Sequence, residues 1–316
     1  MEVERQVSEG RQAGNTGRFL GIDGGGSTTR AVLIDQDGQV ISRATAGPSN
    51  VLVVGKARSS RAVRKTLATI QGPVTALVAG FAGADRAWIH EMWSDFFTGI
   101  RPGTPSWVVA DYEVAWGAHT GGEPGVIAIV GTGSVCYGQA GTQRIKIGGY
   151  GWKIGDAGSG IRLGQLAVQA ALKAMDHLGD ETALLNTVLE WAQAHDREGL
   201  LARIYAPGIG VRVLAELASM VLRCADDDPV AQALVVCEAE RVITQLTATV
   251  KALAVPSLTR IGLIGGLAQL WHPFLHAEGL KAGLPLVVVV PTTPDVGAAM
   301  MAQHFLFARN QETDVF

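Results

Sequence analysis

The chain has 316 residues, of which 47% are hydrophobic and 17% charged, a composition typical of a globular protein with a well-packed core. Acidic side chains (29) slightly outnumber basic ones (26), and the formal net charge of −3 argues against a nucleic-acid scaffold or a polybasic membrane binder. The longest apolar runs fall well short of the ~18 residues that a membrane-spanning helix needs. We therefore expect a soluble, cytoplasmic protein whose partners include neither a nucleic acid nor a membrane.

The start of the chain and its cysteines support this expectation. Residues 1–17 are polar and lack the apolar stretch of a signal peptide, so we expect them to form a disordered leader. The three cysteines, Cys136, Cys224 and Cys237, have neither disulfide nor zinc-site spacing, which favours a reducing compartment. Cys224 and Cys237 fall within helical patterns and are expected in the core.

The first half of the chain reads as strands and helices in the order β-β-β-α-β-α-β, which predicts a mixed sheet with helices on its faces. Short apolar runs bounded by turns predict the strands, and longer amphipathic stretches predict the helices. One strand runs directly into a helix through Asp111. The expected strands cover residues 19–23, 29–35, 40–47, 74–85 and 106–110, and the expected helices cover residues 55–72, 86–97 and 111–119.

A second unit starts near Trp116. Asp228 followed by Pro229 predicts a helix start, because a capping residue precedes a proline in the first turn. We expect domains at residues 18–116 and 117–293, with a closing helix over residues 294–312 that packs back on the first domain. The other elements expected in this unit are strands with glycine loops at 125–141 and 143–160, a largely helical region at 160–255, a strand that opens a helix at 260–270 and a last strand at 284–290.

Two short glycine segments echo each other in the two halves of the chain. "GGGS" (Gly24–Ser27) and "GTGS" (Gly131–Ser134) each lie between two apolar strands. Each would present backbone N–H groups and a hydroxyl at the tip of a hairpin. Two such hairpins suggest a duplicated fold with a cleft between the copies.

The composition of these hairpins suits the binding of phosphate. Glycine amides and hydroxyl groups can donate to phosphate oxygens, and Asp23 can hold Mg²⁺ directly or through water. Taken singly, each loop is also explained by the turn geometry of a tight hairpin. Neither the P-loop pattern nor the dinucleotide-binding pattern fits the sequence, so another phosphate-binding architecture is needed.

Five segments, in order, resemble the motifs of the actin-like ATPase and sugar kinase superfamily. The resemblance is closest to the N-acetylglucosamine and glucosamine kinases and the BadF/BadG/BcrA/BcrD-type ATPases grouped with them, and it extends over about residues 18–305. It implies an α/β protein with the actin-like (ribonuclease H-like) fold: two domains, each a mixed sheet flanked by helices, with the active-site cleft between them. The segments are "GIDGGGSTTRAVL", "VVADYEVAWGAH", "IAIVGTGS", "GGYGWKIGDAGSG" and "IGLIGGLAQ".

The resemblance implies that ATP and Mg²⁺ are the cofactors. In the family, the two hairpins are the phosphate-1 and phosphate-2 loops, and a late Gly-Gly pair lies against the adenosine. Asp23 is the residue expected at the metal. The matching ATP-binding residues are Gly24, Gly25, Gly26, Ser27 and Thr28 in the first hairpin, Gly131, Thr132 and Gly133 in the second, and the pair Gly265 and Gly266.

The resemblance also implies a catalytic acid and a set of sugar contacts. The acid that serves as the base matches Asp111. The chain departs from the family pattern at Ala110, just before that acid, and at Ala157, where glutamate is frequent in N-acetylglucosamine kinases; the second departure leaves the sugar open. The residues matched to sugar contacts are Asn50, Ser134, Gly149, Tyr150, Gly151 and Asp156.

Plainer roles remain open for three of these residues. Asp111 could cap the helix that follows it, Asp156 could satisfy its own loop, and Asn50 could be a turn residue. As a functional group, Asp111 stands at the end of an apolar strand, where open α/β sheets place ligand-binding residues, and its carboxylate can accept the proton of an attacking hydroxyl.

We therefore expect an ATP-dependent kinase that phosphorylates the 6-hydroxyl of glucosamine or N-acetylglucosamine and acts as a homodimer. Two alternatives stay open. An ATPase that activates a partner dehydratase would need cysteines for an iron–sulfur cluster. A sugar-sensing repressor would need a DNA-binding helix-turn-helix.

Overall fold

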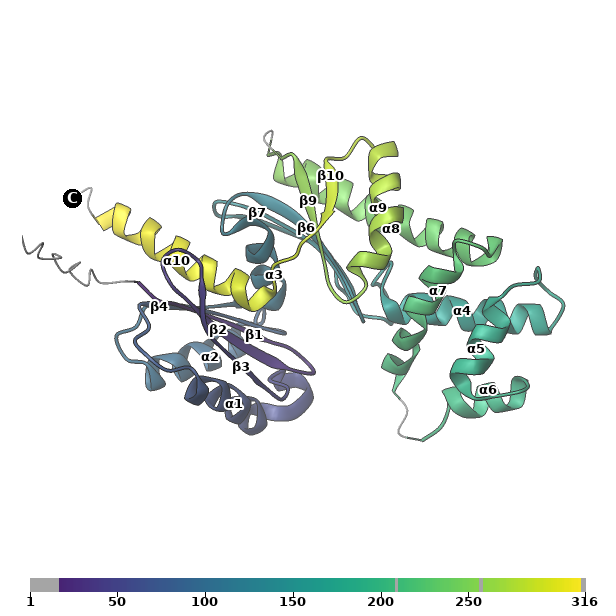
Figure 1. Ribbon diagram of the computed structural model, residues 1–316, viewed down its shortest axis with the longest axis horizontal. Coiled ribbons are helices and arrows are strands. Elements are labelled where there is room, and N and C mark those ends of the chain that lie inside the picture. The colour runs from purple at the N-terminus through teal and green to yellow at the C-terminus, as the bar shows by residue number, and fades with distance from the viewer. Residues whose placement is uncertain (1–16, 208–209, 256–257, 314–316) are drawn as a thin grey trace, which may run out of the picture.

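The computed structural model describes residues 17–207, 210–255 and 258–313, so the expected leader lies outside the described residues except for Gly17. Figure 1 shows two lobes, each built around a β-sheet, with the C-terminal helix returning to the first lobe. Each sheet has five strands and mixes parallel with antiparallel pairs. The expected α/β class, mixed sheets flanked by helices, is confirmed.

The first sheet has the strand order β3-β2-β1-β4-β5. Its first strand pairs antiparallel with the second and parallel with the fourth, which pairs parallel with the fifth. The interior strand β4 is buried along its whole length, as expected for a strand covered on both faces. The strands are β1 (Phe19–Gly24), β2 (Thr29–Ile34), β3 (Val40–Ala46), β4 (Ala76–Phe81) and β5 (Ser106–Ala110).

The second sheet has the same strand order as the first sheet, with each of its strands in the equivalent position. Its order is β10-β9-β6-β7-β8, so its first strand again pairs antiparallel with the second and parallel with the fourth. The two glycine hairpins therefore occupy equivalent places, between the first and second strands of each sheet. The strands are β6 (Gly125–Val130), β7 (Ser134–Ala140), β8 (Gln143–Gly148), β9 (Arg260–Ile264) and β10 (Leu286–Val289).

Two pairs of helices cover the first sheet. α1 (Val51–Thr69) and α2 (Ala87–Ile100) bury their apolar side chains against one face. α3 (Asp111–Thr120) and α10 (Pro294–Thr313) pack against the other face. Because α3 also contacts β6 and β7, it lies between the two sheets, and the boundary expected after Trp116 falls inside it.

The second sheet is covered by the helices of the C-terminal half. The 25-residue α8 (Pro229–Leu253) and α9 (Ala268–Lys281) pack against it. The predicted helix start is confirmed, since the Asp228 carboxylate accepts a hydrogen bond from the Ala231 amide at 2.8 Å. The rest of the expected helical region forms α4 (Gly160–Met175), α5 (Leu184–Ala192), α6 (Arg197–Ile204), the 3-10 helix η1 (Val211–Leu217) and α7 (Ala218–Cys224).

One local expectation holds with an added first turn, and one is wrong. α1 starts at Val51, where the Asn50 side chain accepts a hydrogen bond from the amide of Leu52. Gly55 has non-helical φ and ψ of 76° and 161°, so the regular helix follows this kink, where it was expected to begin. Cys237, expected in the core, is exposed because α8 buries the stripe that contains Val242 instead. Among the described residues, no helix combines the length and the apolar character needed to cross a membrane.

Glycines let α10 approach both β1 and α3 closely. A Cβ at Gly21 of β1 would overlap the carbonyl oxygen of Asp295 and the amide nitrogen of Ala299. A Cβ at Gly297 of α10 would overlap the backbone of Ala118 in α3. Because backbone atoms cannot move aside as a flexible side chain can, these contacts require glycine.

The first prediction concerns this packing. Gly21→Ala should lower the free energy of unfolding by about 1–3 kcal/mol or more, because the added methyl group forces β1 and α10 apart. Gly99→Ala is the matched control, since Gly99 lies in α2 with open space around its Cβ position, and it should be neutral or slightly stabilising. Urea denaturation followed by circular dichroism measures both, and equal stability of the two variants would contradict the packing account.

Candidate active site

The first glycine hairpin joins β1 to β2 and is tied to the segment before α1. The carbonyl oxygen of Gly25 accepts hydrogen bonds from the amides of Ser49 and Asn50, both at 3.1 Å. Asn50, which is remote in the sequence, therefore lies beside the hairpin. Ser27 and Thr28 are exposed at the tip.

The second glycine hairpin joins β6 to β7 and is held by the start of α4. The amide of Gly160 donates to the carbonyl of Gly131 at 2.7 Å, and the amide of Ile161 donates to the carbonyl of Thr132 at 3.3 Å. These bonds use the free N–H groups of the helix start to fix the loop. The hairpin tip is thereby given one conformation.

The Gly265–Gly266 turn follows β9 beside the second hairpin. Gly265 has φ of 118°, and a Cβ there would overlap the backbone carbonyl of Val130, at the end of β6. The amide of Leu267 donates to the same carbonyl at 3.2 Å. Only glycine allows this close approach, which places the late Gly-Gly pair next to the second hairpin.

Asp156 lies in the loop before α4 and faces the second hairpin. It is buried, has φ of 63°, and its Oδ1 accepts a hydrogen bond from the amide of Gly151 at 3.0 Å. Its Oδ2 lies 3.0 Å from where a Cβ of Gly133 would stand. Ser134 Oγ donates to the carbonyl of Ala157 at 2.6 Å. Asp156 thus satisfies its own loop with one oxygen and turns the other toward the hairpin.

Glu238 of α8 anchors the loop before α4, which also holds Asp156. Its Oε2 accepts a hydrogen bond from the amide of Gly158 at 2.9 Å, and Trp271 Nε1 donates to the carbonyl of Gly158 at 2.9 Å. Arg162 and Arg241 each lie 3.2 Å from Glu238 Oε1, so the buried carboxylate is paired. The sequence did not single out this residue, because helical periodicity alone does not distinguish Glu238 from Glu240, the other acid of α8.

Asp111 is the first residue of α3, directly after β5. Its Oδ1 accepts a hydrogen bond from the amide of Tyr112 at 3.0 Å, while Glu113 Oε1 accepts one from the amide of Ala110 at 3.3 Å. Burial raises the pKa of Asp111, and the Tyr112 amide and the ammonium group of Lys146 counter part of that rise. Asp111 therefore contributes to the helix start and also presents a carboxyl group with raised basicity.

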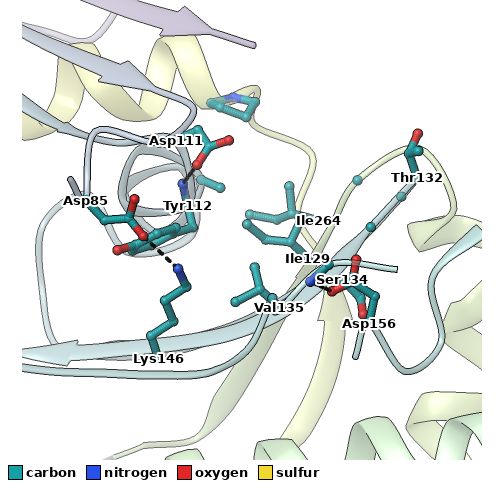
Figure 2. Close-up of a pocket in the computed structure, with 18 of the residues that line it drawn as sticks. Asp85, Asp111, Tyr112, Ile129, Thr132, Ser134, Val135, Lys146, Asp156 and Ile264 are labelled. Atoms are coloured by element: carbon teal, nitrogen blue, oxygen red, sulfur yellow. Dashed lines mark hydrogen bonds and ion pairs between the residues drawn. The ribbon is translucent and has the colours of Figure 1, made fainter. Parts of the chain in front are cut away.

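These elements meet around one cavity of about 550 Å³ between the two sheets. Figure 2 shows Asp111 on one side and Thr132, Ser134 and Asp156 on the other, with the apolar Ile129, Val135 and Ile264 between them. The predicted site residues that line this cavity are Asp23, Asp111, Gly131, Thr132, Gly133, Ser134, Gly149, Gly151, Asp156 and Gly265.

The other predicted site residues lie outside the lining of this cavity. Asn50 caps α1 with its side chain, and Tyr150 is 69% exposed. Their roles, and those of the first hairpin, stay predictions. The residues in this group are Gly24, Gly25, Gly26, Ser27, Thr28, Asn50, Tyr150 and Gly266.

Asp23 carries a strongly perturbed carboxyl group at the end of β1. Burial, followed by the negative charge of Asp111, raises its pKa to about 7, while Arg30, 4.0 Å away, opposes the rise and Asp295 adds to it. Asp295 has one buried oxygen without a hydrogen-bond partner among the described residues. The other oxygen of Asp295 pairs with Arg43 at 3.3 Å.

The carboxylates that line the cavity are ligands of the kind that suits a divalent cation that also binds phosphate. Within the described part of the chain, no group of three or more histidine, cysteine or acidic side chains has the arrangement of a complete metal site. Mg²⁺ is commonly bound by one or two carboxylates together with substrate phosphates, so one or two protein carboxylates suffice. Asp23, Asp85, Asp111 and Asp156 all line the cavity, and the metal role expected of Asp23 stays a prediction.

An ion pair across the cavity was not foreseen from the sequence. Lys146 of β8 lies 2.9 Å from Asp85, in the loop after β4, and its Nζ lies 4.7 Å from the centre of the Tyr112 ring. All three residues line the cavity. Lys146 and Asp85 belong to different lobes and are 61 residues apart, so no local pattern indicates the pair.

The chain is similar to proteins whose activities are named. Residues 20–302 match the sequence signature of the BadF/BadG/BcrA/BcrD ATPase family. An N-acetylmuramic acid/N-acetylglucosamine kinase of Clostridium acetobutylicum is 29% identical over 300 residues, which are 90% of this chain and 97% of that protein. A glucosamine kinase of Vibrio cholerae is 32% identical over 193 residues, which are 58% of this chain and 64% of that protein.

A solved structure is similar over nearly the whole chain. A candidate N-acetylglucosamine kinase of Chromobacterium violaceum superposes with a TM-score of 0.71 and 30% identity, covering 90% of this chain and 98% of that one. This similarity agrees with the actin-like fold that the motifs indicated.

The second prediction tests the electrostatics of the cavity. In the metal-free and nucleotide-free protein, Asp23→Asn should raise the free energy of unfolding by at least about 1 kcal/mol at pH 8. The folded state holds the Asp23 proton up to about pH 7, whereas the unfolded chain releases it near the ordinary value of 3.8, so ionisation destabilises the wild type as pH rises through this window. The gain should disappear below pH 4.

Urea denaturation in a chelating buffer, from pH 4 to pH 8, measures this effect. Asp37→Asn is the control, because it removes a carboxylate from the exposed turn between β2 and β3. A stability difference for Asp23→Asn that does not change with pH would contradict the perturbed titration.

Proposed function

The chain belongs to the BadF/BadG/BcrA/BcrD ATPase family, and we propose that it is an ATP-dependent amino-sugar kinase. The reaction is transfer of the γ-phosphoryl group to the 6-hydroxyl of glucosamine or N-acetylglucosamine. Membership of an ATPase family implies the use of ATP, and the curated relatives are sugar kinases. The observation that carries the proposal is the one cavity that Asp111 shares with the second glycine hairpin and Asp156.

The nucleotide is assigned to the glycine-rich side of the cavity. The amides and hydroxyls of the two hairpins donate to the phosphates, and the Gly265–Gly266 turn lies against the adenosine. Fixed backbone donors suit this task, because they need no reorganisation as charge develops on the transferring group. The bonds from α4 to Gly131 and Thr132 supply that rigidity.

The sugar is assigned to the side that holds Asp111. Its carboxylate accepts the proton of the 6-hydroxyl as that oxygen attacks phosphorus, a role for which burial and raised basicity prepare it. Asp156 and Ser134 hold other hydroxyls of the sugar from the opposite side of the cavity, so the sugar extends across it. Asn50 and the loop over Gly149, Tyr150 and Gly151 complete the proposed sugar contacts. These contacts orient the attacking oxygen in line with the leaving phosphate.

Mg²⁺, held by Asp23 together with phosphate oxygens, would neutralise the charge on the phosphates. The apolar side chains of Ile129, Val135 and Ile264 line the cavity beside the polar residues. They exclude water from the reacting centre, which matters because attack by water would waste ATP.

The alternative role, activation of a dehydratase through an iron–sulfur cluster, is not favoured by the cysteines. Cys136 is buried on β7, Cys224 ends α7, and Cys237 lies on α8. A bridging cluster requires thiolates that meet at a surface.

We also propose that the kinase acts as a homodimer in the cytoplasm, where ATP and free thiols are present.

The third prediction concerns the base. Asp111→Asn should lower kcat about 10²- to 10⁴-fold, because the amide cannot accept the hydroxyl proton, while the affinity for a non-hydrolysable ATP analogue stays close to that of the wild type. A coupled assay of ADP release with glucosamine, N-acetylglucosamine and glucose measures the turnover. Asp37→Asn again serves as the control and should keep full activity.

Two outcomes would contradict the proposal. Turnover that survives in Asp111→Asn would remove Asp111 from the mechanism. Absence of sugar-dependent ADP release by the wild type, together with iron in protein purified without oxygen, would favour the dehydratase activator.

A further inference from the structure

A second cavity of about 640 Å³ adjoins the first. Asp85, Tyr112 and Lys146 line both cavities and form the wall between them. Figure 2 shows these three side chains at the edge of the first cavity, with the ion pair drawn between Asp85 and Lys146. The volume is in the range of small-molecule sites.

Both sheets contribute to the second cavity. From the first lobe come β5, α2 and α3, and from the second lobe come β7 and β8. Trp107, Tyr137 and Phe305 line it, and Trp107 and Phe305 pack edge to face with their ring centres 5.6 Å apart. Aromatic walls of this kind suit the apolar face of a sugar ring.

The cavity also contains a buried carboxylate that lacks a donor. Glu113 is 7% exposed, and its Oε1 caps α3 by accepting the amide of Ala110. Its Oε2 is buried and has no hydrogen-bond partner among the described residues. Arg144 approaches this oxygen only to 3.7 Å, which is ion-pair distance but not a hydrogen bond. A buried acceptor without a donor is costly, so the site gains from a ligand that supplies one.

Cationic groups at the same cavity suit an anion. Arg144 is 56% exposed, so its guanidinium can turn from Glu113 toward a ligand while it stays within ion-pair reach. His90 of α2 also lines this cavity. Guanidinium groups bind phosphate with two parallel hydrogen bonds, which makes Arg144 the natural anchor for a phosphate ester.

We propose that the second cavity is a binding site for a hexosamine phosphate. The amino or hydroxyl group of the ligand donates to Glu113 Oε2, the phosphate pairs with Arg144, and the sugar ring lies against Trp107. The ligand class rests on the proposed function, because a hexosamine phosphate is the product of that reaction; the need for a donor and an anion rests on the cavity alone.

A ligand bound in the second cavity can affect Asp111, the proposed catalytic base, through two contacts. Glu113 holds the amide of Ala110, directly before Asp111, and Lys146 pairs with Asp85 in the shared wall. A ligand that binds Glu113 and Arg144 in the second cavity therefore alters the surroundings of Asp111 without entering the first cavity.

The test is calorimetric titration of the full chain with glucosamine 6-phosphate, while a non-hydrolysable ATP analogue and glucosamine saturate the first cavity. We expect one binding event per chain that weakens at least tenfold in Arg144→Gln and in Glu113→Gln. Glu113→Gln keeps the oxygen that caps α3, so the fold is retained. Arg197→Gln is the matched control, because Arg197 is 54% exposed and pairs with Asp176 on the surface, and it should bind as the wild type does.

Three results would overturn the site. They are the absence of binding to the blocked wild type, binding that neither Arg144→Gln nor Glu113→Gln weakens, and equal affinity of the blocked wild type for inorganic phosphate. The titration needs no turnover, so it fails or succeeds independently of the kinase assay. If the protein phosphorylates sugars but does not bind glucosamine 6-phosphate in the second cavity, only the proposal for the second cavity is refuted.

Discussion

The close contact of α10 with β1 and α3 is the constraint on which the rest of the structure depends. Gly21 and Gly297 allow backbone to meet backbone there, and any side chain at either position would push the elements apart. The contact holds the end of β1, where Asp23 lies, and the start of α3, where Asp111 lies, at one edge of the first sheet. Two half-buried carboxyl groups are thereby kept close enough for the charge of Asp111 to raise the pKa of Asp23.

The duplicated topology supplies the opposite side of the site. Because both sheets have the same strand order, the second hairpin stands in the second lobe where the first stands in its own. Since α3 packs between the sheets, the carboxyl groups of one lobe face the glycine amides of the other across one cavity. Carboxyl groups on one side and backbone donors on the other suit a reaction in which a carboxylate takes the proton of a hydroxyl while the hydroxyl oxygen attacks a phosphate held by the backbone donors.

The sequence predicted the parts of the site that depend on local chain geometry. The hairpins, the acid at the end of β5 and the Asp228 cap each have a signature within a few residues, and the structure bears out the elements that hold them. Long-range pairs have no such signature. The Asp85–Lys146 pair, the anchoring of Gly158 by Glu238 and the unpaired oxygen of Glu113 arise only when distant strands and helices meet. The same reason explains Cys237, since periodicity placed it in a helix but could not say which stripe is buried.

The most direct test of the account is to identify the product by NMR. The protein is incubated with ATP, Mg²⁺ and glucosamine or N-acetylglucosamine labelled with ¹³C at carbon 6, and the ³¹P and ¹³C spectra are recorded. The account predicts a phosphate monoester whose phosphorus couples to the labelled carbon. Release of inorganic phosphate alone, or a phosphate ester at another carbon, would contradict the placing of the sugar 6-hydroxyl between Asp111 and the glycine hairpins.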